Sequence, residues 1–205
     1  MRLIAFLFFQ LLLLSSIAIS QVIIKHPNGL IKEKGDTLNG FKHGVWEYYD
    51  YQGYLIEKYT YSKGIKQGEM VIYHDNGEVK EKGNLVSGKY EGEILSYYSN
   101  GKLFQKRTFV NGIENGEFIL YFDDGNPKKI CTYTNGKLNG ELIENYENGN
   151  NKLKANYQNG KLDGQWTRYF PTGQMKKTGK YMNGKRTGDW MLYDEDGEII
   201  KKHEY

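Results

Sequence analysis

Glycine recurs in this chain at intervals of 24 residues, and this period constrains the fold more than any other feature. All 25 glycines fall into four registers of the period. The three main series are Gly44, Gly68, Gly92, Gly116, Gly140, Gly164 and Gly188; Gly29, Gly53, Gly77, Gly101, Gly125, Gly149, Gly173 and Gly197; and Gly40, Gly64, Gly88, Gly112, Gly136, Gly160 and Gly184, with Gly35, Gly83 and Gly179 as the fourth. A short unit cannot bury its apolar residues alone and must stack on its copies, which predicts an elongated repeat protein rather than a globule around a central pocket.

The first 20 residues differ from the repeats. Arg2 precedes an apolar run from Leu3 to Leu14, and Ala18-Ile19-Ser20 has the small-x-small pattern of a cleavage site. We therefore predict that residues 1–20 are a signal peptide, cleaved after Ser20, and that the protein is secreted or lies in the periplasm or cell envelope. An uncleaved membrane anchor is the alternative. The repeat register begins at Ser20 and leaves no linker after such an anchor, which favours cleavage.

Composition narrows the possible partners. Without Arg2 the chain has 27 basic residues against 25 acidic ones, a balance that argues against nucleic acid as a partner. No stretch after the signal peptide is long and apolar enough to be an integral membrane segment. Cys131 is the single cysteine, so an intramolecular disulfide is impossible.

Each repeat has the pattern of a β-hairpin. We count positions from the first glycine of a unit, with Gly68 as zero. Position two is apolar in every full copy, and positions eight and nine read Asn-Gly or Asp-Gly in most copies, as in Asn76-Gly77 and Asn100-Gly101. Both residues of such a pair tolerate positive φ, so we predict a two-residue type I′ turn there. A second, tight turn is expected to join successive hairpins, as in Asn135 to Gly140.

The predicted turn sets the register of each hairpin. Position two should lie opposite position fifteen, which places Met70 opposite Gly83 and Phe118 opposite Cys131, a large residue beside a small one. We expect the side chains on the face that carries positions two and fifteen to pack against one another. Position thirteen falls on the same face and is mostly charged or polar, so the packed part is expected to be a stripe.

The other face is our candidate binding surface. Position five should lie opposite position twelve, which often places a tyrosine beside a lysine. Both side chains have an apolar part and a polar end, so they suit a partly solvent-exposed surface. The tyrosines are Tyr49, Tyr73, Tyr97, Tyr121, Tyr169 and Tyr193, and the lysines are Lys80, Lys128, Lys152 and Lys176. Planar rings beside lysines can stack on sugars or anchor a protein partner, although holding adjacent hairpins together also explains them.

The expected fold is all-β: an elongated array of antiparallel β-hairpins in one twisted, coiled sheet. Residues 21–43 form a degenerate capping repeat and residues 44–205 seven full repeats, or sixteen strands spanning about 75 Å. A parallel β-helix and a propeller are the alternatives. The β-helix would not need a two-residue I′ turn in the middle of the unit, and a propeller, with four-stranded blades, would favour a period of twice 24 residues.

The string from Gly164 to Lys185, Gly-x-Trp-x-x-Tyr-Phe-Pro-Thr-Gly-Gln-Met-Lys-Lys-x-Gly-x-Tyr-x-Asn-Gly-Lys, resembles the MORN repeat. The likeness is to the bacterial variant found in YwqK family antitoxins, and it covers nearly the whole mature chain. The resemblance implies an elongated sheet of β-hairpins and a role in binding, such as scaffolding, oligomerisation or, in some members, lipid contact.

No constellation of residues indicates catalysis, a cofactor or a metal. His26, His43, His74 and His203 are dispersed and are expected to be exposed polar residues. The acidic run from Asp194 to Glu198 has its glycine at the wrong place for a calcium loop and should be a surface turn. Acids recur at position one, from Glu69 to Asp189, and are expected to pair with lysines. Cys131 occupies a small-residue position that packing explains.

Three functions remain. The first is an exported, non-enzymatic scaffold that presents its tyrosine and lysine face, or an open edge strand, to a protein partner. The second is a cell-wall or carbohydrate-binding module, because aromatic rings suit glycans. The third is an antitoxin that neutralises a toxin by binding, which fits the resemblance but not an exported protein.

Overall fold

A computed structural model describes residues 18–205, which form sixteen β-strands and no helix. Most of the predicted signal peptide, residues 1–17, lies outside the described residues. The strands are β1 Ile19–Lys25, β2 Ile31–Leu38, β3 Phe41–Tyr49, β4 Leu55–Ser62, β5 Ile65–Tyr73, β6 Val79–Val86, β7 Lys89–Tyr97, β8 Leu103–Val110, β9 Ile113–Tyr121, β10 Pro127–Thr134, β11 Lys137–Asn145, β12 Asn151–Gln158, β13 Lys161–Tyr169, β14 Met175–Met182, β15 Lys185–Tyr193 and β16 Ile199–Glu204.

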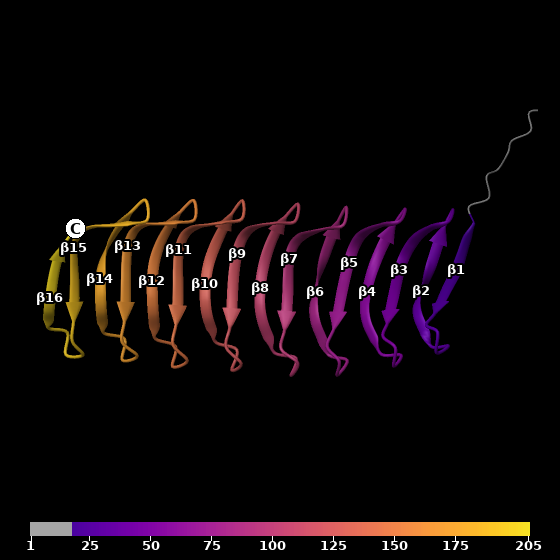
Figure 1. The fold of residues 1–205 in the computed structure, drawn as a ribbon, viewed down its shortest axis with the longest axis horizontal. Coiled ribbons are helices and arrows are strands. Elements are labelled where there is room, and N and C mark those ends of the chain that lie inside the picture. The colour runs from indigo at the N-terminus through magenta and orange to yellow at the C-terminus, as the bar shows by residue number, and fades with distance from the viewer. Residues whose placement is uncertain (1–17) are drawn as a thin grey trace, which may run out of the picture.

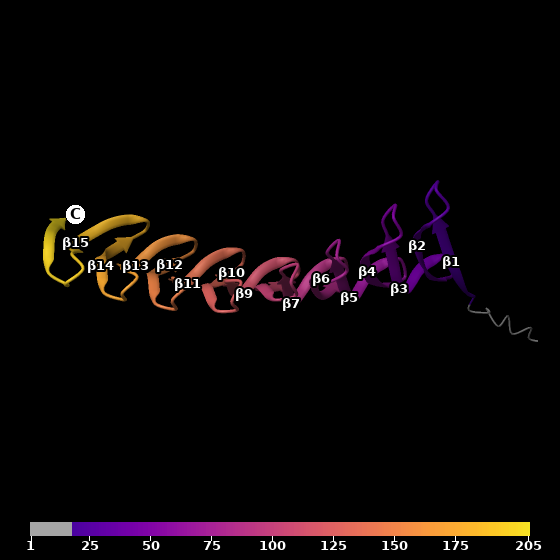
Figure 2. The same ribbon diagram turned by 90° about the horizontal axis from the view of Figure 1, so that it is seen from below.

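The strands form one open sheet in which each pairs only with its neighbours in sequence. The spatial order runs from β1 to β16 without a crossover, and every pair is antiparallel. Figure 1 shows the strands side by side in a single row, and Figure 2 shows that the sheet twists along its length. The predicted array of hairpins is confirmed, and the parallel β-helix is excluded because its strands would run in one direction.

The predicted position of the type I′ turn is wrong. At Asn76-Gly77 only the glycine has positive φ; the amide of Gly77 donates to the carbonyl of His74, and that of His74 to the carbonyl of Glu78. These bonds close a three-residue loop in which one residue needs the left-handed conformation. The two-residue turns lie at the opposite end of the strands, where Asn111 and Gly112 have φ of 52° and 80°. Val110 and Ile113 pair directly across this turn.

A β-bulge corrects the register that the longer loop shifts. In the hairpin of β5 and β6, Tyr73 pairs with Val79, but Ile72 pairs with Glu81, so Lys80 is the extra residue. The bulge restores the predicted opposition of position two and position fifteen, as in Met70 and Gly83. The predicted pairing of position five with position twelve is therefore wrong, and the pairing of position two with position fifteen is right.

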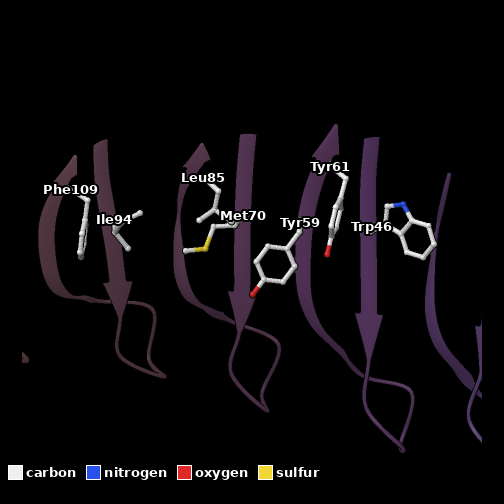
Figure 3. Close-up of a cluster of buried hydrophobic side chains, with 7 residues drawn as sticks. All are labelled: Trp46, Tyr59, Tyr61, Met70, Leu85, Ile94 and Phe109. Carbon is white, nitrogen blue, oxygen red and sulfur yellow. The ribbon is translucent and has the colours of Figure 1, made fainter. Parts of the chain in front are cut away.

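Buried side chains form a stripe on one face of the sheet, which we call the packed face. The most deeply buried large side chains are Trp46, Met70 and Ile94, all at position two. Figure 3 shows seven buried residues of β3 to β8 in a row across the strands: Trp46, Tyr59, Tyr61, Met70, Leu85, Ile94 and Phe109. One layer of sheet cannot enclose its core, so each side chain is buried mainly by its neighbours along this row.

The first hairpin is as regular as the others. Ile19 pairs with Leu38 and Ser20 with Thr37, and the hydroxyl oxygens of Ser20 and Thr37 lie 2.8 Å apart. The predicted cleavage after Ser20 would thus remove the first two residues of β1. Gln21 to Lys25 would remain to pair with β2.

Candidate functional site

The face opposite the packed face carries the predicted tyrosines, and we call it the tyrosine face. All six are half-buried. Two of them lie near a lysine from position fourteen of the preceding repeat: Lys34 Nζ lies 5.4 Å from the ring centroid of Tyr49, and Lys82 Nζ lies 5.4 Å from that of Tyr97. These distances suit a cation–π contact, so the tyrosine face does combine rings with lysines.

The four lysines predicted for this face lie elsewhere. The bulge at position twelve turns Lys128 toward Phe122 and Lys176 toward Phe170, with Nζ 5.4 Å and 5.0 Å from the ring centroids. Lys128 and Lys152 line the same hollow, together with residues of the loops that end β9 and β11. Lys80 is exposed beside the corresponding loop of β5. Lys80, Lys128, Lys152 and Lys176 are therefore on the packed face, at its loop end, and are separated from the tyrosines by the sheet.

The tyrosine face also carries an aliphatic row that the sequence analysis missed. Ile119 and Ile143 lie on β9 and β11, and both pair directly with Ile130 on the strand between them. Val71 and Leu95 continue the row at position three of their repeats, and all five side chains are half-buried. The sequence contained the pattern that predicts this row, because position three is apolar in most copies and lies two residues before the tyrosine, on the same strand face.

Several charged groups on the tyrosine face are paired. Glu47 accepts hydrogen bonds from the hydroxyl of Tyr49 at 2.7 Å and from Lys34 and Lys58 at 2.9 Å and 3.1 Å. Burial alone would raise the pKa of Glu47, but these three donors outweigh it and lower the pKa to about 2.

The predicted pairing of the position-one acids is confirmed for three of them. Lys106 bridges Glu93 and Glu117 at 2.6 Å and 3.4 Å, and Lys202 contacts Asp189 at 2.8 Å.

A half-buried carboxylate organises the packed face near β6 to β8. Glu81 accepts hydrogen bonds from the hydroxyls of Tyr90 and Ser96 at 2.7 Å and 3.0 Å, and from the guanidinium of Arg107 at 3.0 Å. Its side chain is 16% exposed. Burial, together with the Glu81 carboxylate, raises the pKa of Tyr90 to about 12. Glu81, one of the charged residues at position thirteen, is thus accommodated by bonding partners from adjacent strands.

Four segments of the chain match a family model described as a MORN repeat variant. They are residues 66–86, 90–111, 114–135 and 162–183. Each spans most of one hairpin of the sheet, including its three-residue loop. These four segments are MORN repeats. No curated protein sequence matches it.

Adjacent MORN repeats are joined by side chains at their loop ends. Tyr98 and Tyr146, at position six, donate from their hydroxyls to the carbonyls of Tyr121 and Tyr169 in the next repeat, at 3.0 Å and 2.9 Å. Asn76 in the loop donates to the carbonyl of Ser99, also in the next repeat, at 2.7 Å. The loops therefore form a ladder that holds neighbouring hairpins in register.

Two of the histidines belong to this ladder. His26 and His74 are also at position six, with Nε2 3.0 Å from the carbonyl oxygen of Tyr49 and 2.9 Å from that of Tyr97. His26 is buried, so the expectation that the histidines are exposed polar residues is wrong for this one.

The remaining candidates for chemistry have structural roles. Cys131 is buried opposite Phe118, and burial raises the pKa of its thiol. Asp194 accepts bonds from the amides of Asp196 and Glu198, which makes the acidic run one of the loops of the hairpin array. Residues 18–205 contain no group of three acidic, histidine or cysteine side chains that could hold a metal ion. In that same range no helix has the length and apolar character needed to cross a membrane.

Proposed function

We propose that this protein is an exported, non-enzymatic scaffold that binds a protein partner on its tyrosine face. The observation that carries the proposal is the aliphatic row of Val71, Leu95, Ile119, Ile130 and Ile143, which lies on the solvent side of a single-layer sheet beside the tyrosines. Half-buried aliphatic and tyrosine side chains next to paired charges are typical of protein interfaces. The presence of MORN repeats agrees with a binding role.

The hydroxyl groups of the tyrosines also support a binding role for the tyrosine face. Tyr97, Tyr121 and Tyr169 make no side-chain hydrogen bond to another part of residues 18–205, whereas Tyr98 and Tyr146 are used to join repeats. The first group is thus available to a partner. Tyrosine is favoured at interfaces because it combines a large rigid ring with a polar end.

Photo-crosslinking can test this proposal with a matched control. A photoreactive phenylalanine analogue at Tyr121 would face the partner, while the same analogue at the adjacent Phe122 would face the opposite side of the sheet. We expect crosslinks to a defined partner from position 121 but not from position 122, and their loss when Tyr97 and Tyr169 are changed to alanine. Equal crosslinking from both positions, or a partner unaffected by the alanine changes, would refute the assignment to this face.

Export and the antitoxin role are separate parts of the proposal. Export rests on the basic and apolar pattern from Arg2 to Ser20 and predicts a mature N-terminus at Gln21 in secreted or envelope material. Neutralising a toxin, as the YwqK resemblance suggests, is a narrower form of partner binding that requires the partner to be in the same compartment. N-terminal sequencing of fractionated material decides between them: an intact Met1 in the cytoplasm would favour the antitoxin role.

A cell-wall glycan is the alternative ligand. The hollow between Phe122, Tyr146, Lys128 and Lys152, of about 460 Å³, has aromatic and cationic groups suited to a sugar. Retention on peptidoglycan that the Tyr97 and Tyr169 changes leave intact would favour this alternative over protein binding.

A further inference from the structure

The packed face changes its charge along the array. At position thirteen, the first three repeats carry the acids Glu33, Glu57 and Glu81, and later repeats carry Lys129 and Lys177. The three position-twelve lysines of β10, β12 and β14 lie next to this position. The result is a lysine row on the packed face, made of Lys128, Lys129, Lys152, Lys176 and Lys177.

Within residues 18–205, no member of the lysine row makes an ion pair with an acid, in contrast to Lys34 and Lys106 on the tyrosine face. Several rest instead on aromatic rings: Lys129 Nζ lies 5.9 Å from the ring centroid of Phe118 and Lys177 Nζ lies 5.3 Å from that of Trp190. Two acids, Glu144 and Glu147, line the hollows beside these five lysines, so the net charge of the region is positive. Free cations above apolar rings are suited to an anionic, partly apolar ligand.

Parts of the apolar stripe beside the lysine row are less covered than its N-terminal half. At position two, Trp46, Met70 and Ile94 are at most 1% exposed and Leu142 is 3% exposed, but Phe118 and Trp166 on either side of Leu142 are only half-buried. Leu120, Leu153 and Leu162 on the same face are half-buried as well. Two hollows of about 460 Å³ and 210 Å³ open at the loop end of this region. The packed face over β9 to β14 thus carries the lysine row and, beside it, a partly exposed apolar surface.

The spacing of the lysines along the array matches the spacing of residues seven apart on an α-helix. The position-twelve lysines lie on β10, β12 and β14, two strands apart, so they recur about every 9.6 Å along the array. Residues seven apart on an α-helix are separated by about 10.5 Å along its axis. Over two steps the mismatch is about 2 Å, which flexible lysine side chains can absorb.

We propose that the packed face over β9 to β14 binds an acidic amphipathic helix of a protein partner. The helix lies along the array, across the strands. Glu or Asp residues at heptad intervals face the lysine row, and apolar residues on the adjoining helix face cover Phe118, Leu153 and Trp166. This surface is separate from the tyrosine face, so the two can be tested independently.

Designed peptides test both the charge and the spacing. The first is a 21-residue helical peptide with glutamates seven apart and leucines on the neighbouring face; the second has the same composition with the glutamates distributed around the helix. Binding is measured by fluorescence anisotropy with the full mature chain. We expect the heptad-spaced peptide to bind at least roughly tenfold more tightly than the redistributed one, equivalent to about 1.4 kcal/mol.

Charge reversal locates the site. The triple variant Lys128→Glu, Lys152→Glu, Lys176→Glu should lose roughly tenfold or more in affinity for the heptad-spaced peptide. The control triple variant Lys137→Glu, Lys161→Glu, Lys185→Glu changes the net charge equally but lies at the other end of the strands, where all three lysines are exposed. It should retain binding, and circular dichroism confirms that both variants are folded.

Three outcomes would overturn the proposal. Equal affinity for the two peptides would show that helix geometry does not matter. An equal loss in the control variant would show that net charge alone acts. Tighter binding of polygalacturonate or of single-stranded oligonucleotide than of the peptide, lost in the first triple variant, would assign the lysine row to another class of polyanion.

Discussion

The indole ring of Trp46 lies directly against the backbone of Gly35 on the neighbouring strand. The two residues are paired between β2 and β3, and a methyl group added to Gly35 would lie 2.5 Å from ring carbons of Trp46. Close approach, rather than backbone conformation, therefore requires glycine here, since Gly35 does not have a positive φ. The same relationship recurs between Gly179 and Trp190.

Gly35→Ala should destabilise the protein by about 1–3 kcal/mol because the fully buried indole must move. Urea unfolding followed by circular dichroism measures the change. Adding Trp46→Leu supplies the control: the smaller side chain leaves room for the methyl group, so the double variant should lose less than the sum of the single changes. Additive losses would mean that the contact between these residues is not the cause.

Glu81→Leu should cost roughly 3 kcal/mol, because Arg107 then stays half-buried without its carboxylate and two hydroxyl donors lose their acceptor. The double variant Glu81→Leu, Arg107→Leu should recover much of the loss, since no unpaired charge remains. Lys106→Ala, on the exposed tyrosine face, is the comparison and should cost less than about 1 kcal/mol. Similar losses from Glu81→Leu and Lys106→Ala in urea unfolding would contradict this difference.

Glu47 should make the protein sensitive to acid. Its pKa is about 2 in the folded state, below the ordinary value of 4.5. Its ionised form therefore stabilises the fold above pH 4.5, and that contribution is lost as the pH falls toward 2. Glu47→Gln should flatten the fall in unfolding free energy over this range. Parallel pH profiles for the two proteins would show that Glu47 does not contribute.

Lys63→Asn should stabilise the protein by roughly 0.5–1 kcal/mol. Lys63 occupies the first position of a two-residue turn with φ of 50°, where five of the other six repeats that have this turn use asparagine. Asparagine tolerates the left-handed conformation better than lysine. Lys161→Asn is the control, because Lys161 is exposed on a strand without positive φ and should show no gain. An equal change in both variants would remove the backbone explanation.

The 24-residue period was sufficient to predict sixteen antiparallel strands and the opposition of residues such as Met70 and Gly83. These features follow from the alternation of side chains between the two faces of a strand and from a repeated unit that must stack on its copies. Both can be recognised in the amino-acid sequence. The six position-five tyrosines were placed opposite the packed face for the same reason. The aliphatic row was predictable as well, since Ile119 precedes Tyr121 by two residues.

The tertiary structure alone decided the turns and the location of the lysines. Each repeat has two Asn-Gly-like pairs, and an isolated pair can form either a two-residue turn or part of a three-residue loop. The choice depends on which backbone bonds close, as between Gly77 and His74, and on the side-chain bond from Asn76 to the next repeat. The bulge at Lys80 follows from that choice. Because one inserted residue moves a side chain across the sheet, the periodic lysines lie on the packed face and not beside the tyrosines.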